Sequence, residues 1–139
     1  MKKLILLILM ILSLSINVYA SDEQQITKQE ISPVKEYIGE FTITYYCPCG
    51  RCNGYDKHGN PRSYDRYGNP LVWGTVAVDP RVISMHSRLQ IEGYEGTEFV
   101  ARDVGSGVNR NHIDMYVPVS HSEASDMGVR KHVKVWSIK

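Results

Sequence analysis

The sequence predicts an all-β domain, arranged as a small closed barrel or a sandwich. Short segments in which apolar and polar residues alternate recur along the chain, whereas only one short stretch has a helix signature. Alternation with a period of two places one face of a strand in a core. Six such segments within about 100 residues are typical of small barrels and sandwiches.

The six predicted strands share this alternation and are identified by their apolar positions. In chain order these positions are Phe41, Ile43 and Tyr45; Val76 and Val78; Leu89 and Ile91; Phe99 with Ala101 or Val100; Ile113, Met115 and Val117; and Val133 and Val135. The single predicted helix starts with a capping box at Ser120 to Glu123, and Gly128 is placed to end it.

The N-terminal 20 residues have the pattern of a secretory signal peptide. A basic start precedes an apolar run over residues 4–14, and small residues occupy the cleavage-type positions before Ala20. The run is shorter than the roughly 20 residues that span a bilayer, so we expect cleavage and no stable membrane insertion afterwards. Residues 21–38 are polar and suit an arm, and residues 39–139 are expected to fold. These features predict a secreted or cell-envelope protein.

The charge pattern does not favour a nucleic-acid partner. Loss of the two leader lysines changes the net charge from +1 to about −1. Nucleic-acid binding usually needs a dense patch of Lys and Arg, whereas here basic residues are scattered among carboxylates. A neutral or mixed-charge ligand such as a polysaccharide fits better.

A loop rich in Gly, Asn, Pro and Tyr is predicted between residues 50 and 70. It contains two related phrases, residues 56–61 and 65–70, nine residues apart. Its tyrosines are candidates for stacking on sugar rings, although aromatic residues in small barrels more often fill the core.

Three cysteines, Cys47, Cys49 and Cys52, lie close together around the start of this loop. An odd number leaves one thiol over if a local disulfide forms. The alternative is a structural zinc site, completed by His58 or a carboxylate. No metal or other cofactor is required for acid/base catalysis by carboxyl groups.

Three aspartates lie in sequence contexts that are energetically unfavourable for this residue. Asp79 follows an apolar run and precedes Pro80, and Asp103 opens the glycine-rich turn that contains Gly105. Asp114 lies inside a predicted strand, where aspartate has poor propensity, and shares a face with Tyr116. Each has a plain alternative: Asp79 and Asp103 could order turns, and Asp114 could face solvent. Carboxylates with a raised pKa are the usual glycosidase groups, so a carbohydrate site is the functional interpretation.

Four phrases in order resemble a known family. They are Thr75 to Pro80, Ile91 to Tyr94, Ala101 to Gly105 and Asn111 to Tyr116. The set resembles the three-aspartate (3D) domain of stationary-phase survival proteins and the catalytic barrel of the membrane-bound lytic transglycosylase A family. The resemblance covers residues 39–139.

The resemblance implies a six-stranded double-psi β-barrel that cleaves the MurNAc–GlcNAc bond of peptidoglycan glycan strands to give 1,6-anhydro-MurNAc. By position, Asp114 matches the general acid/base, Asp103 the aspartate that supports it, and Asp79 an orienting or substrate-contacting member. Candidates for substrate contact are Thr75, Gly105 and Tyr116. A non-catalytic glycan-binding barrel is the alternative, since one fold can serve both purposes.

Overall fold

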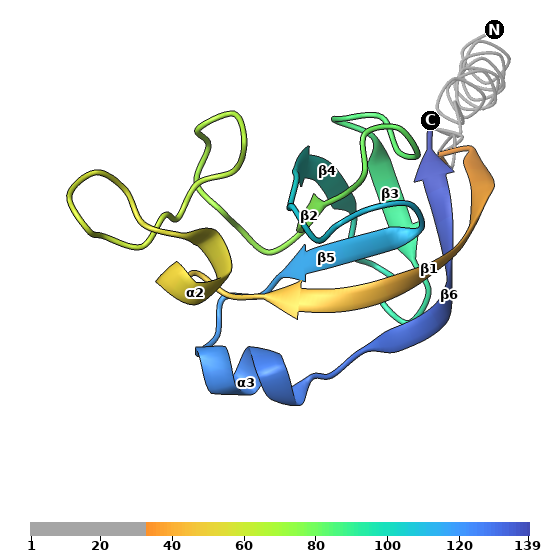
Figure 1. Ribbon diagram of the computed structural model, residues 1–139. Helices are drawn as coiled ribbons and strands as arrows, with labels where there is room; N and C mark the ends of the chain where they lie inside the picture. The colour runs from red at the N-terminus through yellow and green to blue at the C-terminus, as the bar shows by residue number, and fades with distance from the viewer. Residues whose placement is uncertain (1–32) are drawn as a thin grey trace, which may run out of the picture. The chain divides into compact units, whose positions relative to one another are not determined.

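Six strands close into a barrel in the computed structural model, which describes residues 33–139 (Figure 1). Around the barrel they follow the order β1-β5-β2-β4-β3-β6. The predicted signal peptide and most of the polar arm lie outside the described residues. The strands are β1 (Lys35–Tyr46), β2 (Thr75–Ala77), β3 (Arg88–Ile91), β4 (Phe99–Asp103), β5 (His112–Tyr116) and β6 (Arg130–Ile138).

The strand order is mixed. β1 pairs with β5 and β2 pairs with β4 in parallel, whereas the other four neighbouring pairs are antiparallel. Both parallel pairs join strands distant in sequence, because a parallel pair needs a crossover connection. The predicted six-stranded double-psi barrel is confirmed.

The long strand β1 bends to pair on both of its edges. It begins at Lys35, so residues 35–38 of the predicted arm belong to the strand, and Lys35 lies opposite Ile138 of β6. The β1–β6 register shifts between Tyr37 and Gly39, where Gly39 has a φ of 130°. Such a bulge bends the strand, and its backbone conformation is one that only glycine adopts readily.

The barrel interior holds the apolar positions that alternation predicted. Phe41, Ile43, Leu89, Phe99 and Ile113 are among its fully buried side chains, at 0–2% exposure. The opposite face of the same strands is where polar side chains gather, because successive residues point to opposite sides.

Two short helices lie at one end of β1 and β5 (Figure 1). The predicted helix is α3 (His121–Asp126), and its capping box is complete: Ser120 Oγ accepts from the Glu123 N–H, and the Glu123 carboxylate accepts from the Ser120 N–H. The prediction of only one helix was wrong, since α2 (Gly50–Asn53) forms a single turn among the cysteines. Among residues 33–139, neither helix has the length and hydropathy needed to cross a membrane.

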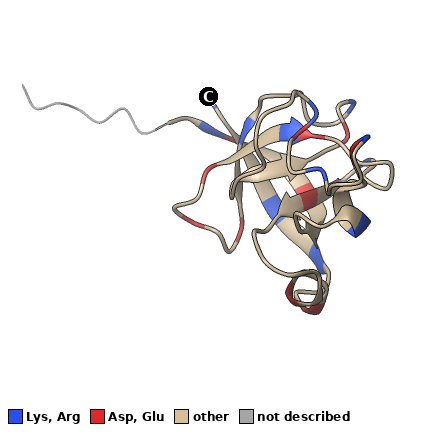
Figure 2. Ribbon diagram, turned by 90° about the vertical axis from the view of Figure 1, so that its left-hand side faces the viewer, with Lys and Arg blue, Asp and Glu red and all other residues tan. Residues whose placement is uncertain are grey.

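The predicted loop duplication is two copies of one turn. Asp56 accepts from the N–H groups of His58 and Asn60, and Asp65 accepts in the same way from Tyr67 and Asn69. An isolated bridge closes each turn, from Tyr55 to Pro61 and from Tyr64 to Pro70. Lys and Arg are interspersed with Asp and Glu around the barrel and its loops (Figure 2).

Replacement of Ser120 by alanine should lower the free energy of unfolding by about 1 kcal/mol, because the first turn of α3 loses its side-chain cap. Ser122→Ala, on the exposed surface of the same helix, is the matched control. Denaturant unfolding of both variants checks this, and equal stabilities would contradict the assigned cap.

Candidate functional site

The strand register places two of the three aspartates on either side of one alanine. Ala77 of β2 lies opposite Asp114 of β5 on one edge and opposite Asp103 of β4 on the other. Adjacent strands are about 4.8 Å apart, so the two aspartate backbones are separated by roughly 10 Å. The small side chain between them leaves space above β2 that both carboxyl groups can reach.

The loop that follows α2 covers this outer face and turns it into a cavity. Leu71 packs with Tyr46, Ala77 and Tyr116 in a small apolar cluster on the outside of the barrel. Beside this cluster is an open cavity of about 530 Å³. Its barrel side is lined by Tyr46, Ala77, Asp103, Gly105, Ser106 and Asp114, and its loop side includes Arg62, Tyr64, Asp65 and Arg66.

Asp114 is half-buried in this cavity, and its pKa is raised above the ordinary value for an aspartate. The main cause is desolvation of the carboxyl group, and the charge of Asp103 adds to it. Thr44 donates a 2.6 Å hydrogen bond to Asp114 Oδ1 and, together with the charge of His112, acts in the opposite direction. Asp114 therefore retains a proton to higher pH than an exposed aspartate does.

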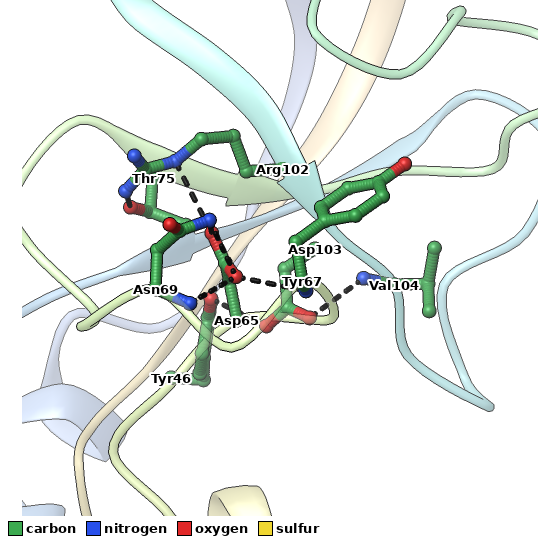
Figure 3. A network of polar contacts seen from close by, with 8 residues as sticks. All are labelled: Tyr46, Asp65, Tyr67, Asn69, Thr75, Arg102, Asp103 and Val104. Carbon is green, nitrogen blue, oxygen red and sulfur yellow. Dashed lines mark hydrogen bonds and ion pairs between the residues drawn. The ribbon is translucent and has the colours of Figure 1, made fainter.

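Asp103 is held by two donors, one on each oxygen. The Tyr46 hydroxyl donates to Oδ2 at 2.9 Å, and the Val104 N–H donates to Oδ1 at 2.9 Å (Figure 3). The pKa of Tyr46 is raised, first by burial and then by the charge of Asp103, so this phenol stays a donor. The arrangement keeps a hydrogen-bonded carboxylate next to Asp114 in the cavity.

Asp65 is a third cavity carboxylate that the functional interpretation of the sequence missed. Its side chain is fully buried, and Arg102 Nε lies 3.4 Å from its Oδ2 (Figure 3). This contact is an ion pair rather than an aligned hydrogen bond, because Nε has no hydrogen-bond partner. Arg102 Nη2 also donates to Thr75 Oγ1 at 2.9 Å, so the loop turn is tied to β4 and β2. The repeated phrase in the sequence drew attention to both Asp56 and Asp65, but only the burial of Asp65 distinguishes the two.

Asp79 does not line the cavity. It is 3% exposed, and its carboxylate accepts from the Arg81 guanidinium and from the N–H groups of Arg81 and Arg110. These bonds hold the pKa of Asp79 far below its usual range, with the Arg81 side chain the largest cause. Asp79 thus orders its own turn and anchors the segment just before β5.

The predicted substrate-contacting residues also differ in whether they line the cavity. Gly105 lines the cavity, whereas Thr75 and Tyr116 are 1% and 5% exposed and lie beneath the surface around it. Thr75 accepts from Arg102, and the Tyr116 ring packs edge-on against Tyr46 at 5.5 Å. Both support the residues that line the cavity wall.

The three cysteines are brought together with a histidine that the sequence analysis did not select. Cys47, Cys49, Cys52 and His121, hereafter the Cys–His cluster, have one ligand atom each within 4.8 Å of one another, and they could hold a metal ion. The expected fourth ligand, His58 or a carboxylate, was wrong because the chain returns to this point only at α3. All three cysteines are free thiols.

Residues 74–139 match the family described as 3D domain. Over these residues the chain is similar to 3D domain proteins. The matched region contains Asp79, Asp103 and Asp114, while β1, the loop and the cysteines precede it.

Two relatives from Bacillus subtilis (strain 168) are similar to part of this chain. It is 46% identical over 77 residues to "Cell wall-binding protein YocH", and 33% identical over 86 residues to "Putative cell wall shaping protein YabE". These matches cover 55% and 58% of this chain but only 22% and 18% of the relatives. The crystal structure of the Escherichia coli lytic transglycosylase MltA is 26% identical, with a TM-score of 0.45, over 58% of this chain and 29% of that one.

Asparagine at positions 114 and 79 should change stability in opposite directions. Asp114→Asn should raise Tm at neutral pH, because it removes a charge that the cavity desolvates. The gain should grow as pH rises through the raised pKa of Asp114 and vanish in acid. Asp79→Asn should lower Tm at neutral pH, and its deficit should shrink as pH falls below the ordinary aspartate pKa, about 4.

Thermal unfolding of both variants and the wild type between acidic and neutral pH measures this contrast. A loss of stability in Asp114→Asn at neutral pH would contradict the assigned environment of Asp114.

Proposed function

We propose that this protein is a peptidoglycan lytic transglycosylase that cleaves the MurNAc–GlcNAc bond and forms 1,6-anhydro-MurNAc, with Asp114 as general acid and base. The observation that carries the proposal is a half-buried carboxyl group with a raised pKa in an open polar cavity. Such a group keeps its proton to higher pH than an exposed aspartate, so it can donate a proton where an exposed aspartate is already ionised.

The proposed reaction uses one carboxyl group twice. Asp114 donates its proton to the glycosidic oxygen as the bond from this oxygen to C1 of MurNAc breaks. The resulting carboxylate then accepts the proton of the C6 hydroxyl as O6 attacks C1 and closes the anhydro ring. No water is consumed, and Asp114 ends protonated as it began, so a second catalytic carboxylate is not required.

Asp103 supports this reaction electrostatically in two ways. Its charge raises the pKa of Asp114, which favours the proton-donating form. A fixed carboxylate in the same cavity also stabilises the positive charge that develops at C1 in an oxocarbenium-like transition state. The two hydrogen bonds from Tyr46 and Val104 hold Asp103 in place for this role.

A hydrogen-bonded path through Thr44 links Asp114 to His112. His112 Nε2 lies 2.8 Å from Thr44 Oγ1, and Nδ1 lies 3.2 Å from the Gly107 carbonyl oxygen, which can only accept. The Thr44 hydroxyl has a single hydrogen. When Nε2 is protonated, that hydrogen goes to Asp114 and stabilises its charged form. When Nε2 is unprotonated it can take that hydrogen, which leaves Thr44 able to accept from a protonated Asp114.

The cavity has the chemistry of a sugar site. Carboxylates, arginines and backbone groups surround a volume of about 530 Å³, and Tyr64 is a half-exposed aromatic residue at its loop side. Tyrosine combines a flat face for stacking on a pyranose ring with a polar tip. In this proposal Asp79 orders its turn and anchors the segment before β5 without touching substrate, and Thr75 and Tyr116 support the cavity wall.

The names of the two relatives support a cell-wall ligand, since one is called cell wall-binding and the other a putative cell wall shaping protein. Together with the predicted signal peptide, they favour action outside the cytoplasm on peptidoglycan. The word "binding" also favours the second candidate function, a non-catalytic glycan-binding barrel. The chemistry itself needs no cofactor, and a metal ion at the Cys–His cluster would be structural.

Incubation of purified peptidoglycan with the protein should release anhydro-muropeptides detectable by mass spectrometry. Asp114→Asn should lower the rate by about 10²- to 10⁴-fold, the usual contribution of a general acid/base. Asp126→Asn, an exposed change on α3, is the control. Peptidoglycan that is bound by the wild-type protein but never cleaved would establish the binding barrel instead.

Thr44→Val should move the alkaline fall of activity to higher pH. The Thr44 hydrogen bond lowers the pKa of Asp114, so its removal lets the acid keep its proton further into the alkaline range. Thr42→Val, two residues earlier on β1, is the control. Initial rates across pH measure the shift, and a shift to lower pH would contradict the assigned donor.

A further inference from the structure

The Cys–His cluster has the spacing of ligands around a single tetrahedral ion. Cys47 Sγ and Cys52 Sγ are 3.7 Å apart. The His121 Nδ1 atom lies 3.8, 3.5 and 3.7 Å from the sulfurs of Cys47, Cys49 and Cys52, respectively. One nitrogen is therefore nearly equidistant from three sulfurs.

These separations match zinc coordination. Zn–S bonds of about 2.3 Å and Zn–N bonds of about 2.0–2.1 Å at tetrahedral angles put sulfurs about 3.8 Å apart and a nitrogen about 3.6 Å from each sulfur. A disulfide would instead bring two sulfurs to about 2.05 Å. A disulfide would also not account for the position of the third thiol and the imidazole beside the other two sulfurs.

Contacts with the surrounding fold help to position the four ligands. Cys47 is fully buried at the end of β1 and packs with Val117 and Ala124. The Asn53 amide donates to the carbonyl oxygens of Cys47 and Cys49, which closes the turn of α2 around the cysteines. The capping box fixes the first turn of α3, which begins at His121.

We propose that the Cys–His cluster binds one structural Zn²⁺ ion. Three thiolates and one imidazole form a closed Cys₃His set of the kind that structural zinc sites use, and no position is left open for water or substrate. The ion joins α2 to α3, whose ligands Cys52 and His121 are 69 residues apart in sequence. It therefore cross-links the two ends of the segment that contains most of the cavity residues.

The zinc site also adjoins the cavity. Cys52 and Asn53 line the cavity, so α2 contributes to its wall. With only four residues, α2 is too short to be stable alone. Zinc therefore holds this wall in place without touching substrate, and this consequence, unlike the site itself, rests on the proposed function.

Metal analysis of the purified protein should find one zinc ion per chain. Replacement of zinc by Co²⁺ should give the visible bands of a tetrahedral ion and the near-ultraviolet bands of thiolate-to-cobalt charge transfer. Cys49→Ser and His121→Ala should lose most of the zinc, whereas His58→Ala, in the neighbouring loop, should keep it. A strong chelator should lower Tm for the wild type and His58→Ala.

The readouts are independent of glycan cleavage, so the zinc site and the transglycosylase can fail separately. If the ligand variants do not fold, the cobalt spectrum and the chelator effect on the wild type decide the question. A wild-type protein without zinc, without thiolate–cobalt bands and with unchanged Tm in chelator would overturn the proposal. Detection of a disulfide among the three cysteines by mass spectrometry would overturn it as well.

Discussion

The candidate site depends on one constraint, the register of three adjacent strands. Closure of the barrel places β2 between β5 and β4, and Ala77 then separates Asp114 from Asp103. Both carboxyl groups lie on the outer face because the interior positions are taken by apolar residues. A shift of one residue in either pairing would turn one carboxyl group toward the core, where an unpaired charge is prohibitively costly.

The covering loop sets the environment of that face. Its buried Asp65 pairs with Arg102, and Leu71 packs on the aromatic residues of β1 and β5. This cover makes a cavity out of an exposed sheet surface and removes water from around Asp114. The aspartates therefore divide by surroundings: Asp79 is surrounded by donors and stays ionised, whereas Asp114 has one strong donor and stays protonated more readily.

Much of this architecture was predictable from local patterns. Alternation located all six strands, and an aspartate inside the strand segment His112 to Val117 marked Asp114 as unusual. The capping box predicted α3 because its signal lies within four residues. Closure into a double-psi barrel came from the family resemblance, since alternation alone does not distinguish a barrel from a sandwich.

Other features depended on contacts between distant segments. Asp56 and Asp65 have similar local sequences and the same turn, and only packing against Arg102 separates their roles. His121 lies 69 residues beyond Cys52, so spacing could not identify it as the fourth member of the cysteine cluster. The family resemblance implied an orienting or substrate-contacting role for Asp79, but only the structure revealed that Arg81 and the Arg110 backbone occupy its carboxylate.

The proposed mechanism requires the cavity to keep Asp114 protonated at a pH where exposed aspartates are ionised. Titration of the side-chain carboxyl carbons by ¹³C NMR, with the Asp114 signal assigned by its absence in Asp114→Asn, measures this directly. Asp114 is expected to titrate clearly above the ordinary aspartate pKa of about 4. Titration at or below that value would contradict it, because the proposed acid would then have no proton to donate.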